Sequence, residues 1–256
     1  MTAELDSFSL RGKRAVVTGA SRGLGRAMAE ALAAAGADVV CVSTSREGTD
    51  ATAKQIRALG RKAWQFGCNL SDRGATSALS RAIETEAGDV DILVNNAGTI
   101  RRHPASDYPA VDWDAVLETN LTSVFLLCQA FGKRMIERKR GKIINVASLL
   151  SFSGGIRVPA YTASKHAIAG LTKALANEWA QHGVQVNAIA PGYFKTDNTQ
   201  ALQDDATRFT EISARIPSGR WGEPEDLRGP VVFLASSASD YVNGHLLVVD
   251  GGWMAR

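Results

Sequence analysis

Short, uninterrupted runs of apolar residues alternate along this chain with longer stretches in which apolar residues recur at helical spacing. The runs of strand length lie near residues 14–18, 38–43, 62–67, 91–94, 142–147, 184–190 and 245–249. Strands that alternate with helices form mostly parallel sheets, and strands without polar alternation are covered on both faces. The pattern therefore predicts a single α/β domain over residues 1–256, with a doubly wound, mostly parallel seven-stranded sheet and helices on both faces.

A glycine-rich turn follows the first predicted strand. Thr18 precedes Gly19, and glycines recur at Gly23 and Gly25, where an alanine-rich helix begins that is expected to end near Ala35. Glycines let the backbone approach a pyrophosphate closely, and the free N–H groups of the helix N-terminus attract its charge. A tight strand-to-helix turn without a ligand has the same composition. Together with the motif that follows, the turn indicates a Rossmann-like dinucleotide site.

Three side chains with catalytic chemistry lie within eighteen residues of one another. Ser148 ends an apolar run, and Tyr161 and Lys165 are four positions apart, on one face of a predicted helix. A nearby ammonium lowers the pKa of a phenol from about 10, which makes the phenol a better proton donor at neutral pH. A surface tyrosine beside a lysine stem has the same spacing. With the glycine turn upstream, we expect Tyr161 to exchange a proton with an alcohol or ketone oxygen, Lys165 to lower its pKa, and Ser148 to hydrogen-bond the same oxygen.

The composition argues against several other classes of function. A net charge of +3 over 256 residues is too small to indicate a nucleic-acid partner. There is no apolar N-terminal segment and no run of eighteen apolar residues, so we expect a cytoplasmic protein without a membrane partner. Cys41, Cys68 and Cys128 are an odd number in apolar settings, which indicates reduced, packed thiols. The four histidines show no metal-ligand spacing, and no metal site is predicted.

With these motifs in order, the chain resembles the short-chain dehydrogenases/reductases over nearly its whole length. Asn95-Asn96-Ala97-Gly98 matches a turn of that family, Asn120 its helical asparagine, and Pro191-Gly192 with Thr196 its nicotinamide turn. The resemblance implies an NAD(P)-dependent oxidoreductase acting on CH–OH groups. It implies catalytic roles for Asn120, Ser148, Tyr161 and Lys165, with Asn120 holding a water that relays protons from Lys165. It also implies that the cofactor contacts Gly19, Ser21, Arg22, Gly23, Leu24, Gly25, Ser43, Thr44, Arg46, Asn69, Leu70, Asn96, Ala97, Gly98, Tyr161, Lys165, Pro191, Gly192, Phe194 and Thr196.

Within this family the second half of the chain resembles the bacterial 2-dehydro-3-deoxy-D-gluconate 5-dehydrogenases, also called 2-deoxy-D-gluconate 3-dehydrogenases. The segments that carry this resemblance are 148–159, 190–193 and 239–253. It implies interconversion of a secondary alcohol and a ketone on a small keto or hydroxy sugar acid. It also implies a homotetramer that pairs long helices around 112–138 and 160–182. The residues expected to contact the substrate are Arg101, Arg102, Ser148, Arg157 and Tyr193.

The end of the second predicted strand bears on the choice of cofactor. A carboxylate there would hydrogen-bond the adenosine ribose and repel a 2′-phosphate. Here the strand ends in Ser43, Thr44 and Ser45, followed by Arg46, and Arg22 lies in the glycine turn. Hydroxyls and guanidiniums favour NADP(H), whereas the dehydrogenases that the chain resembles more often use NAD(H). The residues themselves therefore favour NADP(H) within the general expectation of NAD(P)(H).

Residues 193–221, the lid segment, are predicted to be a polar excursion between the Pro-Gly turn and a helix that starts near Glu223. Loops of this length in compact domains are usually functional. In the family that the chain resembles, this segment closes over the substrate.

Two other functions remain open at this point. The first is reduction of a β-ketoacyl group on an acyl carrier protein, for which the glycine turn and second strand look much the same. Arg101, Arg102 and Arg157 argue against it, because cations suit a small carboxylate better than an acyl chain. The second is a non-catalytic dinucleotide-binding regulator on the same fold. The presence of both Tyr161 and Lys165 favours an enzyme.

Overall fold

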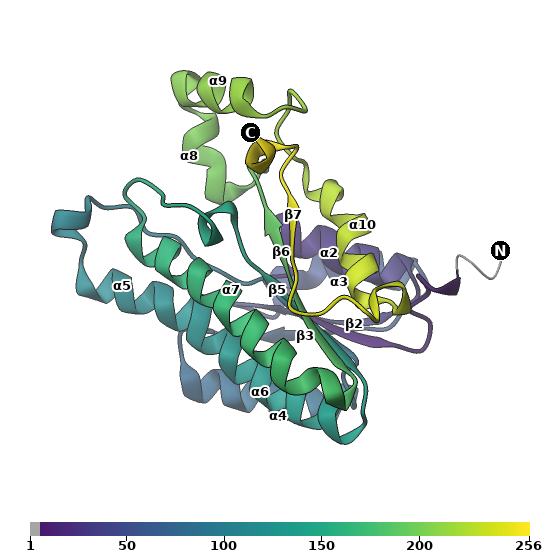
Figure 1. Cartoon of the computed structure of the whole chain (residues 1–256). Helices are drawn as coiled ribbons and strands as arrows, with labels where there is room; N and C mark the ends of the chain where they lie inside the picture. Colours follow the sequence, from purple (N-terminus) through teal and green to yellow (C-terminus); the bar gives the residue numbers. More distant parts are fainter. Residues whose placement is uncertain (1–5) are drawn as a thin grey trace.

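The computed structural model of the chain describes residues 6–256, which form one parallel sheet with helices on both faces (Figure 1). The strand order is β3-β2-β1-β4-β5-β6-β7, and each neighbouring pair is parallel. The strands are β1 (Arg14–Thr18), β2 (Asp38–Ser43), β3 (Ala63–Gly67), β4 (Ile92–Asn95), β5 (Gly141–Val146), β6 (Val184–Pro191) and β7 (Leu246–Val249). The α-helices are α2 (Gly23–Ala34), α3 (Asp50–Ala58), α4 (Arg73–Ala87), α5 (Ala110–Leu117), α6 (Ser123–Glu137), α7 (Pro159–Trp179), α8 (Gln200–Gln203), α9 (Ala206–Arg215) and α10 (Arg228–Ala235). The predicted fold class is confirmed.

Successive residues of each strand enter different hydrophobic clusters, one on each face of the sheet. Val16 of β1 belongs to a cluster with Phe131 of α6 and Trp179 of α7. Its neighbour Val17 belongs to the opposite cluster, with Met28 of α2. Both valines are fully buried, because helices cover both faces. This double burial explains why the strands are uninterrupted apolar runs, and their predicted bounds differ from the observed ones by at most one residue.

The predicted long helix around 112–138 is interrupted. A π-helical turn, Glu118–Thr122, joins α5 to α6. The whole stretch Ala110–Glu137 is long and apolar enough, by length and composition, to cross a membrane. Its apolar residues Leu127 and Phe131 instead lie in the core, packed against the sheet.

The three cysteines are free and buried, as the sequence predicted. Burial raises the pKa of the Cys41 and Cys128 thiols to about 12. Both thiols therefore stay protonated at neutral pH and serve as packing groups.

The lid segment rises above the carboxyl ends of β6 and β7 (Figure 1). It contains a 3₁₀ turn, Asp197–Thr199, followed by α8 and α9, two short helices that the sequence reading did not predict. A hydrophobic cluster separate from the two sheet clusters holds it together, centred on Ile212, Ile216 and Trp221. The helix expected from Glu223 begins as a 3₁₀ turn and continues as α10.

Candidate active site

The glycine turn after β1 leaves bare backbone where a phosphate could approach. Gly19 has a φ of +67°, and a Cβ at Gly25 would overlap the carbonyl oxygen of Gly19. Arg22 is the N-cap residue of α2, and its side chain makes no capping hydrogen bond. The first N–H groups of α2 therefore remain available to an anion, at the positive end of the helix dipole. This geometry fits a dinucleotide pyrophosphate.

The turn after β4 is fastened to the glycine turn by hydrogen bonds. The Thr18 hydroxyl oxygen accepts from the backbone N–H groups of Asn96 and Ala97, both at 3.0 Å. The Asn96 side-chain amide donates to the carbonyl oxygens of Thr18, at 2.9 Å, and Gly19, at 3.3 Å. In the buried core below, the Asn95 amide donates to Asn145 at 2.9 Å, which links β4 to β5. Two loops at the carboxyl edge of the sheet are thus held in one arrangement.

A cavity of about 570 Å³ opens at this edge. It is lined by every predicted cofactor residue except Arg46, namely Gly19, Ser21, Arg22, Gly23, Leu24, Gly25, Ser43, Thr44, Asn69, Leu70, Asn96, Ala97, Gly98, Tyr161, Lys165, Pro191, Gly192, Phe194 and Thr196. Ser148 and Arg101 also line it. The structure therefore brings the glycine turn and the Ser-Tyr-Lys set into one site.

The Ser-Tyr-Lys set spans the end of β5 and the start of α7. Ser148 caps a short 3₁₀ turn and accepts a hydrogen bond from the Leu150 N–H at 3.1 Å. Tyr161 lies in the first turn of α7, which begins at Pro159, where proline is favourable because no N–H is needed. The Lys165 ammonium lies 5.5 Å from the centre of the Tyr161 ring and donates to the Val146 carbonyl at 2.6 Å.

Asn120 lies in the π turn between α5 and α6, behind the cavity wall. Its amide donates to the Thr99 carbonyl at 2.9 Å and to the Ser164 hydroxyl at 3.2 Å, and its oxygen accepts from the Thr99 N–H at 2.8 Å. Asn120 is buried and does not line the cavity. The π turn leaves helix α5–α6 with irregular backbone beside the site, a common location for such turns.

The causes that shift the pKa of Tyr161 differ from the prediction. Burial raises the pKa of the phenol, while a hydrogen bond from Ser148 and the charge of Arg102 lower it. Lys165 was expected to be the main group that lowers this pKa, but it is not among these causes. Its ammonium lies over the ring and donates to the Val146 carbonyl. Burial lowers the pKa of Lys165 to about 8. On balance burial prevails and the pKa of Tyr161 is raised, so the predicted lowering by Lys165 is wrong, although the sequence located the Tyr-Lys pair correctly.

The free energy of unfolding is expected to rise between pH 8 and pH 10 for the natural chain relative to a Lys165→Met variant. An unfolded lysine titrates near 10.5 and folded Lys165 near 8, so in this window the unfolded chain binds the extra proton. Stability therefore increases with pH, by about 2 kcal/mol across the window, and this contribution is lost as the pH falls from 10 to 8. Urea unfolding of both chains at several pH values measures the difference. Parallel pH profiles would contradict a buried, ionisable Lys165.

The three arginines predicted to contact the substrate occupy different positions. Arg101 lines the cavity, and its guanidinium lies 3.6 Å from the Asp112 carboxylate. Arg102 is half-buried and does not line the cavity, but it donates to the Asn198 carbonyl at 2.9 Å and lies near enough to Tyr161 to affect its pKa. Arg157 is exposed, does not line the cavity, and has a φ of +63°. The structure therefore brings Arg101 to the cavity and Arg102 near Tyr161, and it leaves Arg157 outside the site.

Two further predicted residues lie away from the cavity lining. Tyr193 packs at the base of the lid segment, with its ring centre 5.4 Å from Trp221 and 4.7 Å from Trp253. Arg46, predicted to be a guanidinium of the NADP(H) site, precedes a short 3₁₀ turn and has an exposed side chain. Neither position could be distinguished from a cavity position by sequence spacing alone.

Several cavity-lining residues were not predicted. They include Cys68, Ser71, Thr99, Ala115, Thr119, Val146, Ala147, Asp197, Asn198 and Thr199. Thr99 directly follows the predicted Asn-Asn-Ala-Gly turn, and Asp197 directly follows Thr196. Extending each motif by a residue or more would have included them.

A dinucleotide cradle and a Ser-Tyr-Lys set at the carboxyl edge of a Rossmann-like sheet define a nicotinamide-dependent oxidoreductase. Residues 13–207 match the family model of the short chain dehydrogenases, and the chain belongs to this family.

Its relatives include sugar-acid dehydrogenases that match it over nearly their full length. The chain is 54% identical over 254 residues to the 2-dehydro-3-deoxy-D-gluconate 5-dehydrogenase of Pseudoalteromonas atlantica, which covers 98% of this chain and 100% of the relative. It is 55% identical over 254 residues to the Escherichia coli protein of the same name, and the match covers 98% of this chain and 99% of the relative. A solved gluconate 5-dehydrogenase of Burkholderia cenocepacia, in complex with NADP and tartrate, is 41% identical with a TM-score of 0.95, covering 99% of each chain.

Proposed function

We propose that this chain is an NADP(H)-dependent dehydrogenase that interconverts a hydroxyl and a ketone on a small sugar acid of the 2-dehydro-3-deoxy-D-gluconate type. The observation that carries the proposal is the near-full-length identity of 54–55% to two relatives of that name. The Ser-Tyr-Lys set in the cavity supports the chemistry, and two arginines beside it support an anionic substrate.

The cavity fits the adenosine end of NADP(H) as well as its pyrophosphate. Ser43 and Thr44, at the end of β2, line the cavity beside Ser21 and Arg22, with hydroxyls and a cation where NAD-specific sites of this fold place an acid. When bound, the reduced nicotinamide would supply the hydride added to the substrate carbon, and the oxidised nicotinamide would accept the hydride removed from it.

The proton is handled by the chain's own residues. Tyr161 donates it to the ketone oxygen during reduction and removes it from the hydroxyl during oxidation. Ser148 donates a hydrogen bond to the same oxygen, a contribution of about 3 kcal/mol by comparison with other oxyanion donors. Lys165, whose pKa of about 8 is near neutrality, binds the cofactor ribose and passes protons towards a water held by Asn120.

The substrate carboxylate is assigned to Arg102, with Arg101 at the rim of the cavity. A planar guanidinium grips a carboxylate through two parallel hydrogen bonds and so fixes the orientation of the ketone. The negative charge of the carboxylate distinguishes a sugar acid from a β-ketoacyl thioester, whose reacting end carries no carboxylate.

A matrix of steady-state assays tests the proposal, with NADPH and NADH each paired with sugar-acid ketones and with a β-ketoacyl thioester. We expect the specificity constant for NADPH to exceed that for NADH by about tenfold or more, because each charge-assisted contact to a 2′-phosphate contributes about 1.5–3 kcal/mol. We expect the specificity constants for the sugar-acid ketones to exceed that for the thioester by a similar or larger factor. A tenfold preference for NADH would contradict the cofactor assignment, and a preference for the thioester would contradict the substrate assignment.

We also propose that the enzyme is a cytoplasmic homotetramer. Val124, Leu127 and Phe131 of α6 are buried within the subunit and are not available to a partner. Trp113 and Phe125, in the same helical stretch, are exposed large apolar residues and support an interface along α5 and α6. Light scattering of the purified protein tests the assembly.

A further inference from the structure

One short turn of the lid segment contacts both sides of the cavity. Asp197, the first residue of the turn Asp197–Thr199, forms an ion pair with Arg22, with 2.6 Å between the carboxylate Oδ2 and the guanidinium Nε. Arg22 belongs to the glycine turn. The carbonyl oxygen of the next residue, Asn198, accepts a hydrogen bond from Arg102 Nη2 at 2.9 Å. Arg102 belongs to the loop after β4, so the turn connects the cofactor side of the cavity to the catalytic side.

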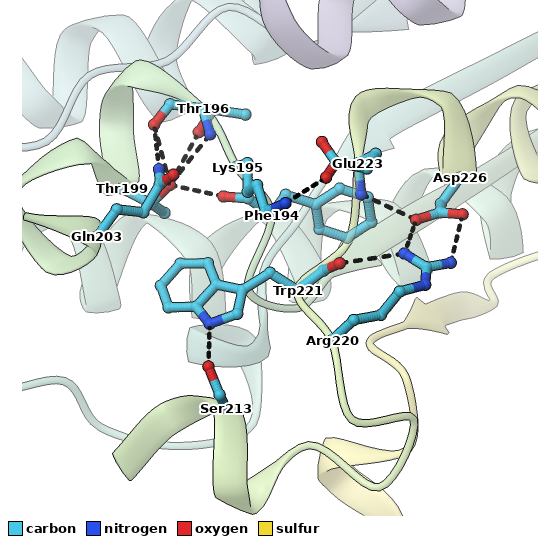
Figure 2. Close-up of polar contacts among 10 residues, drawn as sticks. All are labelled: Phe194, Lys195, Thr196, Thr199, Gln203, Ser213, Arg220, Trp221, Glu223 and Asp226. Carbon is cyan, nitrogen blue, oxygen red and sulfur yellow. Dashed lines mark hydrogen bonds and ion pairs between the residues drawn. The ribbon is translucent and has the colours of Figure 1, made fainter. Parts of the chain in front are cut away.

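The turn is rigid because its own hydrogen bonds hold it. The Thr199 hydroxyl donates to the Phe194 carbonyl at 2.5 Å and accepts from the Thr196 N–H at 3.1 Å (Figure 2). The Gln203 amide donates to the Thr199 hydroxyl at 3.1 Å and to the Thr196 carbonyl at 3.3 Å. The Asp197 carboxylate and the Asn198 carbonyl therefore move with the lid segment as one unit.

The other polar contacts in this part of the lid segment lie at its base. Lys195 forms an ion pair with Glu223, and the Trp221 indole donates to Ser213 at 2.9 Å (Figure 2). The Arg220 guanidinium binds the Asp226 carboxylate with two hydrogen bonds of 2.7 and 2.9 Å. These contacts stabilise the base of the lid segment. Among the ion pairs of residues 6–256, only that of Asp197 links the lid segment to the glycine turn.

The ion pair is weak in itself, which suits a contact that must open. The side chains of Arg22 and Asp197 are 77% and 69% exposed, and exposed ion pairs contribute about 0–1 kcal/mol. Both residues line the cavity, so the pair crosses its mouth.

We propose that Asp197 is a positioning residue that retains the bound dinucleotide by closing the lid segment onto Arg22. The inference rests on the proposed function only in requiring that a nicotinamide dinucleotide occupies the cavity. The tie from Asn198 to Arg102 makes the same closure hold Arg102 beside Tyr161, so retention of the cofactor and assembly of the catalytic side are coupled.

Whether loss of the Asp197 charge speeds or slows release of the dinucleotide separates this proposal from simple electrostatics. The dinucleotide is a polyanion, so loss of a nearby negative charge by itself should slow its release. If Asp197 closes the cavity, its loss should instead speed release. Asp204→Asn is the matched control, because Asp204 is an exposed acid of the same lid segment. Its side chain accepts a hydrogen bond from Gln200 at 2.8 Å and makes no ion pair within residues 6–256.

The experiment measures release of NADPH from the full-length protein by stopped-flow fluorescence, without substrate. We expect Asp197→Asn to release NADPH about three- to fivefold faster than the natural chain, the most that an exposed ion pair supports, and Asp204→Asn to release it no faster. Raising the ionic strength should speed release from the natural chain more than from Asp197→Asn. Unchanged or slower release from Asp197→Asn would overturn the proposal. Failure of the natural chain to bind NADPH or NADH would overturn the proposed function instead.

Discussion

Replacing Tyr161 with phenylalanine is expected to lower turnover by about a hundredfold to ten-thousandfold, the usual contribution of a positioned acid/base group. The ring is retained, so its packing against the cavity wall and beneath Lys165 should persist. The dissociation constant for NADP(H), measured by fluorescence titration, should therefore change by no more than a few-fold. Steady-state rates with a sugar-acid ketone measure the loss.

Tyr241→Phe is the control for this change, because Tyr241 is fully exposed and the same hydroxyl is removed from the surface. Its turnover should match that of the natural chain. Turnover of Tyr161→Phe within tenfold of the natural chain would show that another group transfers the proton.

Replacing Arg102 with lysine is expected to raise KM for sugar-acid ketones by about ten- to a hundredfold, because a charge-assisted contact contributes about 1.5–3 kcal/mol. Lysine keeps the charge but loses the planar pair of donors. Reduction of a small uncharged ketone should change little. The pH dependence of kcat/KM gives a second readout, because Arg102 lowers the pKa of Tyr161 through its charge. Arg102→Lys, which keeps the charge, should leave the apparent pKa in place, whereas Arg102→Met should move it upward.

The Arg157→Lys variant tests which assignment of the substrate carboxylate is correct, the one made from the sequence or the one made from the structure. The sequence placed Arg157 beside the substrate, whereas the structure leaves its side chain exposed and outside the cavity. We expect its KM to stay near that of the natural chain. A large rise for Arg157→Lys, with none for Arg102→Lys, would mean that the carboxylate binds on the other side of the site.

The sheet and the cofactor cavity could be predicted because their physical causes are local. A strand covered on both faces is apolar at every position, so the β5 core residues Ile143 and Ile144 face opposite helical layers yet read as one run. Neighbouring atoms leave no room for a Cβ at Gly19 or Gly25, so only glycine fits at these two positions. Parallel strands then bring their carboxyl ends, and the motifs that follow them, to one edge.

The positions of the arginines, and the groups that shift the pKa of Tyr161, could not be predicted from the sequence. They depend on the paths of loops and on burial. Arg102 and Arg157 both lie in loops, and their distance from Tyr161 is decided by a positive φ at Arg157 and by the tie from Arg102 to Asn198. Lys165 has the right helical spacing from Tyr161, but its ammonium is drawn to the Val146 carbonyl. The lid helices are amphipathic segments that pack on each other, away from the sheet, so their apolar residues were too few to stand out.

The most direct measurement of the central claim follows the hydride from cofactor to sugar acid. NADPH that carries deuterium at the transferred position is mixed with the enzyme and the ketone form of a 3-deoxy sugar acid, and the product is examined by NMR. We predict that deuterium appears on the carbon that bears the new hydroxyl, in an amount equal to the NADPH consumed. Absence of NADPH consumption with sugar-acid ketones, under conditions in which a β-ketoacyl thioester is reduced, would contradict the assignment of this chain as a sugar-acid dehydrogenase.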